Sequence, residues 1–475
     1  MHARSHCTAG AVVFLALASA LPLTAQYSAQ PAGTLSVTTS SDEARAAFLA
    51  GLDDVENIFF ERGAQQLRRA LSTDPKLGIA RAAYGLFAPG LTAAQRDQEI
   101  NQGVADAANA STGELLLALA WRARGADRAA ERSTLFKAAA ALLPEDRHLA
   151  YYVANSEPSL QERVRQLEAI TRRFPDYAPP LNQIAYAKNT LGDVAGALTA
   201  AEQQVKVAPN NPNPHDSYAE LLQFAGRLDE AATHYQQAMA LDGDYIAAHT
   251  GLAEVALLQG DGATARTHYG HAMDKDQVPQ NRLNYRQAIA VTHVNEGNLT
   301  AAMAGFTAVA EEAEQNRYPA IAAAAHRNLA VLEAALGDKN TPHGHLAKSQ
   351  EIGGDVPAQQ VFAAVTHALL GHMAPAKAAA ARFAEGGSAP NPAPALMRNI
   401  HSVNGIVAAA GGGSAAALDE SQKAGPAGAL AKALAAEGLK KEGKRSEAQA
   451  LRDEVLAYSQ VDLFTVIAKQ RAKKI

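Results

Sequence analysis

The sequence predicts an all-α fold, an α-solenoid of stacked helix hairpins, and two observations carry this prediction. A 34-residue unit occurs three times in tandem, with Gly192, Gly226 and Gly260 standing 34 residues apart. In addition, 48% of the 475 residues are hydrophobic but only 5% are aromatic. The apolar material is mostly alanine and leucine, which favours closely packed helices over sheets. The three units are 178–211, 212–245 and 246–279.

The residues around each glycine explain how one unit forms a hairpin. Glycine adopts the left-handed backbone conformation without a steric penalty, so it suits the place where the first helix ends and the chain reverses. In the second unit Ala219 stands seven residues before Gly226 and Ala231 five residues after it. Small side chains here let two antiparallel helices cross closely, and Tyr235 fills the space toward the next hairpin. Because one hairpin alone leaves an apolar face in water, we expect the hairpins to stack.

This spacing resembles that of the tetratricopeptide repeat, which has the same length, small residues at the helix crossing, a following aromatic residue and a terminal proline such as Pro209. The chain departs from the family pattern at the early tryptophan, where Leu181, His215 and His249 stand instead. The resemblance implies a right-handed superhelix whose concave surface is lined by the first helix of each pair. It implies a protein partner but does not indicate which one.

Weaker copies of the unit on both sides of the triplet predict that the solenoid extends along most of the chain. The Gly/Pro/Asn/Ser-rich stretch 386–394 is the strongest candidate for a boundary. The last amphipathic helix, with Leu463, Phe464 and Ile467, is interpreted as a cap, and a docking helix for a partner is the alternative. The predicted segments are a signal peptide (1–25), a flexible segment (26–43), divergent repeats (44–177), the repeat array (178–385), a linker (386–394) and C-terminal repeat-like helices with the capping helix (395–475).

The N-terminus has the pattern of a secretory signal. Arg4 precedes an apolar run over 9–21, and Leu23-Thr24-Ala25 resembles a cleavage site. Cleavage would remove Cys7, the only cysteine, so the mature chain would form no disulfide. We therefore expect a periplasmic or secreted protein of the bacterial cell envelope, without a membrane span after cleavage. A retained membrane anchor is the alternative, although the apolar run is shorter than the ~20 residues that a span needs.

Composition and motifs argue against several other function classes. The formal net charge of -5 is spread along the chain and no basic stripe occurs, so nucleic-acid binding is not expected. The stretch from Gly438 to Lys444 matches most of a phosphate-binding loop, but Arg445 stands where that loop needs Ser or Thr. No catalytic or dinucleotide motif occurs. The chain is predicted to be non-enzymatic and to use no cofactor.

Histidine pairs are the remaining candidates for chemistry. His343 and His345 flank one glycine, and His268 and His271 stand three residues apart, so each pair offers two metal ligands. No third ligand follows at a suitable spacing. We predict no metal site, but the sequence leaves open whether the pairs bind metal. Another set recurs at the same place in its repeats, which favours packing between helices: His215, His249 and His326.

The first helices of the units supply the candidate partner-binding residues. Family members that hold a C-terminal carboxylate place Lys and Arg on this surface, whereas this chain places mostly Asn, Asp and Glu there. A neutral or basic extended segment is therefore the better prediction, and plain solvated helix faces are the alternative. The candidates are Asn182, Tyr186, Asn189, Asn213, Asp216, Glu220, Gln223, Thr250, Glu254, Asn284, Gln287, Arg327 and Asn328.

Two functions remain open at this stage. One is a protein–protein interaction scaffold in the cell envelope that binds a partner segment in the concave groove. The other is an auxiliary spacer or docking subunit of an export or polysaccharide-secretion machine. Asp216, Glu220 and Glu254 are predicted to gather on one concave wall, which favours a groove ligand that presents Lys or Arg. The identity of that partner and the oligomeric state do not follow from the sequence.

Overall fold

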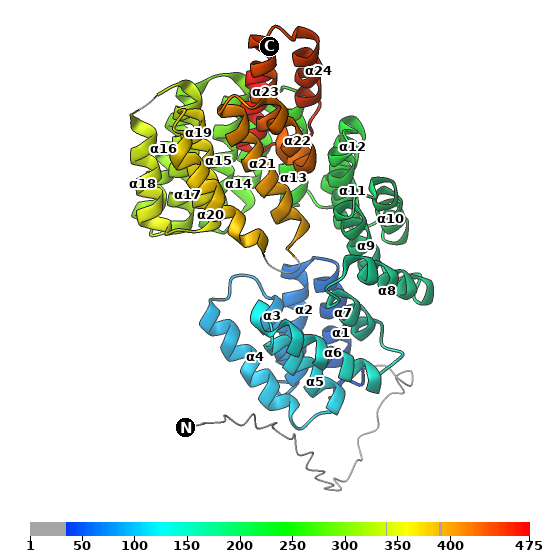
Figure 1. Ribbon diagram of the computed structural model, residues 1–475. Helices are drawn as coiled ribbons and strands as arrows, with labels where there is room; N and C mark the ends of the chain where they lie inside the picture. Colours follow the sequence, from blue (N-terminus) through cyan, green and yellow to red (C-terminus); the bar gives the residue numbers. More distant parts are fainter. Residues whose placement is uncertain (1–34, 339, 389–391) are drawn as a thin grey trace, which may run out of the picture. The chain divides into compact units, whose positions relative to one another are not determined.

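The computed structural model describes residues 35–338, 340–388 and 392–475, and every regular element among them is a helix (Figure 1). The predicted all-α fold class is confirmed. The predicted signal peptide, residues 1–25, lies outside the described residues. None of the helices in the described part combines the length and the apolar character that a membrane span requires. The chain divides into two compact units, Met1–Val153 and Ala154–Ile475.

The first unit consists of helix hairpins, α1 with α2, α3 with α4 and α5 with α6, followed by most of α7. Neighbouring hairpins pack through their first helices, because α3 contacts both α1 and α5. The bounds are α1 (Asp42–Glu56), α2 (Phe60–Thr73), α3 (Gly78–Phe87), α4 (Ala93–Ala107), α5 (Thr112–Arg122), the 3₁₀ turn η1 (Ala126–Arg128), α6 (Ala129–Leu142) and α7 (Arg147–Asn155).

Residues 35–41 belong to the segment expected to be flexible, but the first unit holds them in place. Leu35 is buried and its N–H donates to the Asp146 carboxylate at 2.8 Å. The buried Glu114 carboxylate accepts both the N–H of Thr38 at 2.9 Å and its hydroxyl at 2.5 Å. The expectation is therefore wrong for these residues, because distant carboxylates accept their hydrogen bonds and composition does not reveal such partners.

The second unit is one continuous run of hairpins, α9/α10 to α23/α24, with α8 before it and α25 after it. The bounds are α8 (Leu160–Arg173), α9 (Pro179–Thr190), α10 (Val194–Val207), α11 (Pro212–Phe224), α12 (Leu228–Leu241), α13 (Ile246–Leu258), α14 (Gly262–Lys275), α15 (Pro279–Glu296), α16 (Leu299–Gln315), α17 (Pro319–Leu336), α18 (Thr341–Gly353), α19 (Pro357–Leu369), α20 (Met373–Ala384), η2 (Glu385–Ser388), α21 (Pro394–Ala410), α22 (Ser414–Ala424), η3 (Gly425–Gly428), α23 (Ala429–Lys441), α24 (Arg445–Leu456) and α25 (Leu463–Ala472).

The hairpin geometry follows the repeat pattern of the sequence. Gly226 has a φ of +77° between α11 and α12, where residues with a Cβ are disfavoured. Ala219 on α11 and Ala231 on α12 are fully buried in one core with Tyr235. The first helices of successive hairpins lie side by side: α11 contacts α9 and α13, and α15, α17, α19, α21 and α23 contact one another in turn. These first helices form an inner layer of the second unit.

The Gly/Pro-rich stretch 386–394 does not separate two cores. Phe383 on α20 and Ile400 on α21 belong to the same hydrophobic cluster. The division between compact units falls after Val153 instead. The helices before and after the stretch therefore belong to one stack of hairpins.

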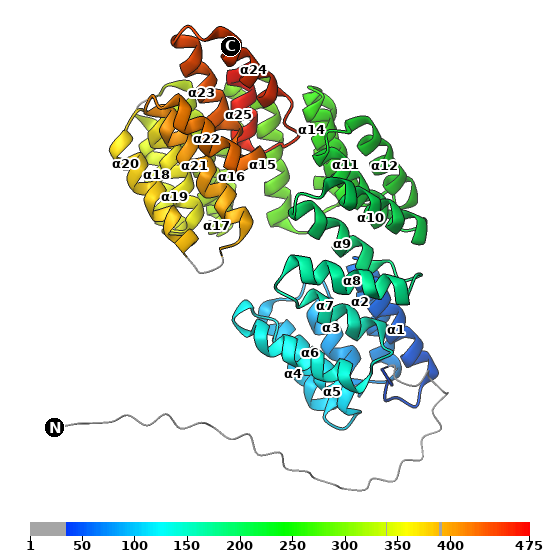
Figure 2. The ribbon, with the colours of Figure 1, turned by 45° about the vertical axis from the view of Figure 1, so that its right-hand side comes forward.

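The C-terminal helix α25 packs into its own chain. Its buried residues, among them Leu463 and Ile467, join the cluster formed by α19, α21 and α23. Figure 2 shows α25 beside α15, and it contacts α15, α23 and α24. Phe464 lies against Phe362 of α19, with ring centres 5.0 Å apart. The helix therefore covers the last hairpin and also reaches the inner side of earlier hairpins.

A larger side chain at the crossing of α11 and α12 should destabilise the second unit. We expect Ala219→Leu to lower the free energy of unfolding by about 1 to 3 kcal/mol, because the fully buried site has no room for three more carbons. Denaturant unfolding followed by circular dichroism measures the change. Ala240→Leu, at an exposed position of α12, is the control and should stay within about 0.5 kcal/mol. An unfolding curve of Ala219→Leu equal to that of the unmodified chain would contradict the assigned packing.

Candidate functional site

The inner surface of α9, α11 and α13 brings together the three carboxylates of the prediction. We call Asp216, Glu220 and Glu254 the acidic wall. Asp216 and Glu220 lie one turn apart on α11, and Glu254 lies on α13, which packs beside α11. All three side chains are half-buried. Their charges interact, since Glu220 and Glu254 both act on Asp216.

Hydrogen bonds from neighbouring hairpins orient two of these carboxylates. The hydroxyl of Tyr186 on α9 donates to Glu220 at 2.5 Å. The amide of Gln223 on α11 donates to Glu254 at 2.8 Å. Neither donor carries a charge, so these bonds fix positions without neutralising the wall. Glu220 and Glu254 are thereby held in position without a cationic partner.

Burial and charge repulsion raise the pKa of Asp216 and of Glu254. Burial, and then the charges of Glu220 and Glu254, raise the pKa of Asp216 to about 7. Burial also raises the pKa of Glu254, and the hydrogen bond from Gln223 counteracts part of this effect. Asp216 is therefore about half protonated near neutral pH, which is the behaviour of a carboxyl without a cationic partner.

The nearby cations are engaged elsewhere. Lys188 on α9 pairs with Glu168 on α8 at 2.9 Å. Arg227, in the turn after α11, pairs with Glu230 at 2.6 Å. No ion pair found within the described residues includes a member of the acidic wall. Three carboxylates thus share one surface without a lysine or arginine of the same chain.

Three predicted partner-binding residues serve instead to join the repeats. Asn182 is buried and donates to the hydroxyl of Ser217 on the next hairpin at 2.9 Å. Asn213 is buried and accepts a long, 3.5 Å bond from Tyr245. Gln223 is also buried. The prediction that these three amides face a ligand is wrong, because neighbouring hairpins cover them and use their hydrogen-bonding groups.

Arg327 on α17 is a further correction. Its side chain is buried, and its guanidinium lies 5.7 Å from the ring centre of Phe362. Burial lowers the pKa of Arg327. An aromatic ring therefore contacts this cation inside the second unit. Arg327 does not line an open groove.

The remaining candidates are at least partly accessible. Asn284 is exposed, and Asn328 donates to Gln287 at 3.1 Å on the neighbouring first helix. Thr250 donates its hydroxyl to the Ala247 carbonyl of its own helix at 2.7 Å. These side chains continue the polar inner surface beyond α13, but they add no charge to it. Tyr186 and Asn189 are half-buried on α9.

A cavity of about 930 Å³ adjoins this surface at the C-terminal ends of α9 and α11. Asn189 and Phe224 line one side, and α19, α21, η3 and the α24–α25 loop supply the other sides. Phe224 is exposed although it is a large apolar residue. The side of the cavity opposite Phe224 includes Arg398 and Phe464. The sequence analysis missed this cavity because its lining comes from segments more than 130 residues apart, as Gly226 and Val361 are, and no local pattern signals their meeting.

The recurring histidines pack between the two helices of a hairpin, as predicted. His215 meets His234 with their Nδ1 atoms 3.3 Å apart, and His249 meets His268 at 3.4 Å. His326 and His345 repeat the arrangement at 2.9 Å. His345 is thereby separated from His343, with which the sequence had grouped it.

The stacked hairpins and their inner surface define an α-solenoid scaffold. Residues 225–290 match the family model described as Tetratricopeptide repeat. This match, the 34-residue spacing and the consecutive helix pairs agree that the chain contains tetratricopeptide repeats. Repeats of this family generally mediate protein–protein interaction, and the family and fold are typically those of non-enzymatic scaffolds.

Comparisons with individual proteins reach only parts of the chain. A TPR repeat-containing thioredoxin, TTL4 of Arabidopsis thaliana, is 34% identical over 77 residues, which are 16% of this chain and 11% of that protein. Among solved structures, TTC0263, a thermophilic TPR protein in Thermus thermophilus, is 21% identical with a TM-score of 0.33, covering 37% of this chain and 97% of its own. MamA 41-end from Desulfovibrio magneticus RS-1 is 17% identical with a TM-score of 0.30, covering 34% of this chain and 94% of its own.

The histidine pairs should make stability depend on pH. Burial, and then the facing histidine, lower the pKa of His234 and of His268. In the unfolded chain these histidines have a pKa near 6.5, so at acidic pH the unfolded chain binds more protons than the folded chain does. The free energy of unfolding should therefore fall as pH drops below about 6.5. We expect the double variant His234→Gln and His268→Gln to lose less stability between pH 7.5 and 5.5, as measured by denaturant unfolding.

The control for this prediction is His401→Gln. His401 occupies the corresponding place in a later hairpin but pairs with Glu420 at 2.9 Å instead of a second histidine. This variant should not show the shallower pH dependence. Equal pH dependence in the unmodified chain and the double variant would show that the pairs do not govern it.

Proposed function

We propose that the chain is a protein–protein interaction scaffold that holds a basic, extended segment of a partner protein along α9, α11 and α13. The acidic wall is the observation that carries this proposal. Glu220 and Glu254 accept hydrogen bonds that join neighbouring hairpins, but those bonds do not explain why three carboxylates without a cationic partner share one surface, because like charges repel. A lysine or arginine side chain would relieve that repulsion and form charge-assisted hydrogen bonds with the carboxylates.

The cavity supports an extended ligand rather than a single cation. Asn189 and Phe224 lie at the ends of the same helices, α9 and α11, that carry part of the polar surface and the wall. A segment whose basic residue meets the wall has an apolar-lined space within reach a few residues further along. The proposed ligand is thus a short basic stretch next to an apolar residue. Binding it would favour the charged form of Asp216 and release a proton near pH 7.

The alternative is a spacer that docks through its C-terminal region. That function needs apolar surface on α25 for a partner, whereas Leu463 and Ile467 are buried in the core of the chain's own hairpins. The groove proposal does not need α25 to move.

Neutralising the acidic wall should weaken binding and leave the fold intact. We expect Asp216→Asn, Glu220→Gln and Glu254→Gln together to reduce capture of the partner at low salt about tenfold or more, since each close charge pair contributes on the order of 1.5 kcal/mol or more. Affinity capture from the source extract with the unmodified chain identifies the partner. Its dissociation constant is then measured against salt, and affinity should fall as ionic strength rises.

A matched control removes three charges from the second helices of the same hairpins. Glu202→Gln, Glu230→Gln and Asp274→Asn are exposed substitutions on α10, α12 and α14 and should leave affinity nearly unchanged. Equal binding by the wall variant and the unmodified chain at low salt would refute the groove proposal. Loss of binding after deletion of α25, with the wall variant unaffected, would favour the spacer alternative.

We also propose that the protein acts in the cell envelope after removal of residues 1–25. The proposal rests on Arg4, the apolar run 9–21 and the Leu23-Thr24-Ala25 sequence. Mass spectrometry of the N-terminal peptide from fractionated cells should find a mature chain that begins near Gln26, in the periplasm or the medium. Chains that keep Met1 and remain in the cytosol would contradict it.

A further inference from the structure

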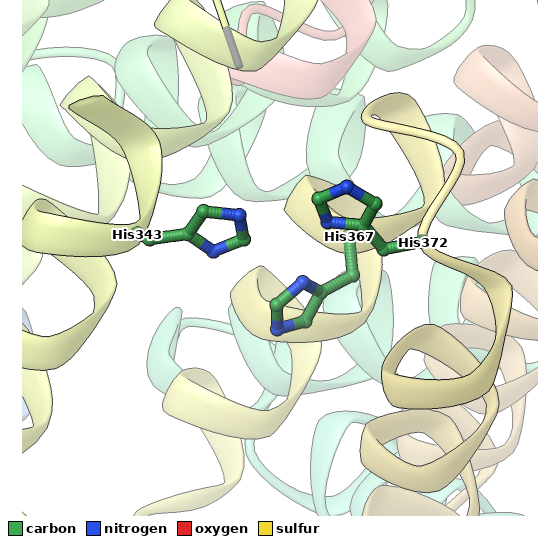
Figure 3. A group of neighbouring side chains, drawn as sticks. All are labelled: His343, His367 and His372. Atoms are coloured by element: carbon green, nitrogen blue, oxygen red, sulfur yellow. The ribbon is translucent and has the colours of Figure 1, made fainter. Parts of the chain in front are cut away.

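Three histidines converge where α18, α19 and α20 meet, as Figure 3 shows. His343 lies in the first turn of α18, His367 near the end of α19, and His372 directly before α20. One nitrogen from each ring lies within 4.8 Å of the other two. The rings of His343 and His372 are nearly parallel, with an interplanar angle of 6° and centres 5.2 Å apart. Two consecutive hairpins therefore contribute to one cluster.

The backbone fixes two of these histidines relative to each other. Gly371 has a φ of +76°, which lets the chain reverse immediately after α19. The N–H of His372 then donates to the carbonyl of His367 at 2.9 Å. His367 and His372 are five residues apart in sequence and are held on either side of this chain reversal. His343 approaches them from the preceding hairpin.

One imidazole nitrogen of the cluster is unpartnered among the described residues. Nδ1 of His367 is buried and has no hydrogen-bond partner. A buried polar atom without a partner is unfavourable unless a ligand satisfies it. An unprotonated imidazole nitrogen is the form that binds metals.

We propose that His343, His367 and His372 bind one divalent transition-metal ion of the Zn²⁺ class. Neutral imidazoles are preferred ligands of Zn²⁺, Ni²⁺ and Cu²⁺, and three protein ligands leave a position for water or another donor. Tetrahedral coordination with bonds of about 2.1 Å places ligand nitrogens about 3.4 Å apart. The observed separations contract to this value through side-chain rotation, because His372 is exposed and His343 only half-buried.

In two other clusters of the described residues the central histidine is already hydrogen-bonded. In the first unit His148 already bonds Glu56 at 2.7 Å, and Arg147 neutralises Asp53 at 2.5 Å. In the second unit, Nδ1 of His249 lies 3.4 Å from Nδ1 of His268. Nε2 of His249 lies 3.4 Å from a backbone carbonyl oxygen. The central histidine of each cluster is therefore engaged, in contrast to Nδ1 of His367.

The ion would add a link to a junction that also contains polar contacts. α18 and α19 are antiparallel, and at the opposite end of their interface the hydroxyl of Ser349 donates to Gln359 at 2.6 Å. That amide in turn donates to the carbonyl of Leu346 at 3.0 Å. A metal bound by His343 and His367 would secure the other end of the same interface. The inference concerns α18–α20 and is independent of the groove ligand.

Zinc titration of the chain without a histidine tag tests the site. After treatment with a chelator and dialysis, calorimetry with ZnCl₂ should show one ion bound per chain, with weaker binding below about pH 6.5 because protons compete for the imidazoles. His372→Gln removes an exposed ligand and should lower the affinity about 100-fold, since even residues that only orient a ligand contribute 10- to 100-fold. Saturating ZnCl₂ should raise the Tm of the unmodified chain by several degrees and that of the variant by much less.

The matched control is His271→Gln, an exposed histidine that lies against His249 in another histidine cluster. This variant should bind Zn²⁺ as the unmodified chain does. His367→Gln should lose affinity like His372→Gln, and circular dichroism without metal establishes that each variant is folded. Absence of a bound ion, unchanged affinity in folded His372→Gln, or loss of affinity in His271→Gln would overturn the proposal.

Discussion

Close contact between alanines at the helix crossings is the constraint on which the rest of the structure depends. Ala219 with Ala231, and Ala253 with Ala265, are fully buried where the two helices of a hairpin meet. Small side chains let the backbones approach, and the approach leaves so little space that a positive-φ glycine must reverse the chain between them. Since every hairpin has this thickness, each first helix comes to lie beside the next one. The inner surface of the second unit is a direct result.

Polar side chains on this inner surface determine how one hairpin sits on the next. The bonds from Tyr186 to Glu220, from Gln223 to Glu254 and from Asn182 to Ser217 each join a first helix to its neighbour. Apolar packing tolerates small sliding, whereas a directional hydrogen bond between buried groups does not. Glu220 and Glu254 are therefore held in place before any partner binds. Such preorganisation lowers the entropic cost of association.

The sequence predicts the repeated parts of this structure and fails where distant segments meet. The spacing of Gly192, Gly226 and Gly260 was sufficient to predict the turns, because the period directly reflects a repeated local conformation. The meeting of Asp216, Glu220 and Glu254 also follows from the period, since equivalent positions of stacked hairpins lie side by side.

Periodicity alone does not distinguish a side chain that faces the groove from one that turns toward the next hairpin. Asn182, Asn213 and Gln223 stand at inward places, but burial depends on the side chains of the neighbouring repeat. The sequence also could not predict the convergence of His343 with His367 and His372. It joins two hairpins across an irregular connection, and the sequence had grouped His343 with His345, which packs against His326 instead.

The C-terminal helix covers one part of the inner surface of the second unit and leaves another part uncovered. α25 covers the inner side near α15 and α23, where the amide of Gln470 donates to the backbone carbonyl of Asn295. The loop before α25 then reaches the ends of α11 and α13, since Ser459 donates to the carbonyl of Phe224 at 3.1 Å and Val461 packs near Leu257. The chain thus fills one part of its inner surface with its own helix.

A solenoid without such a helix would present similar inner faces throughout, whereas here the carboxylates of α11 and α13 lie next to a stretch already occupied. The loop that ends the filled part also lines the cavity, so a segment bound along the acidic wall would meet that cavity where the free surface stops.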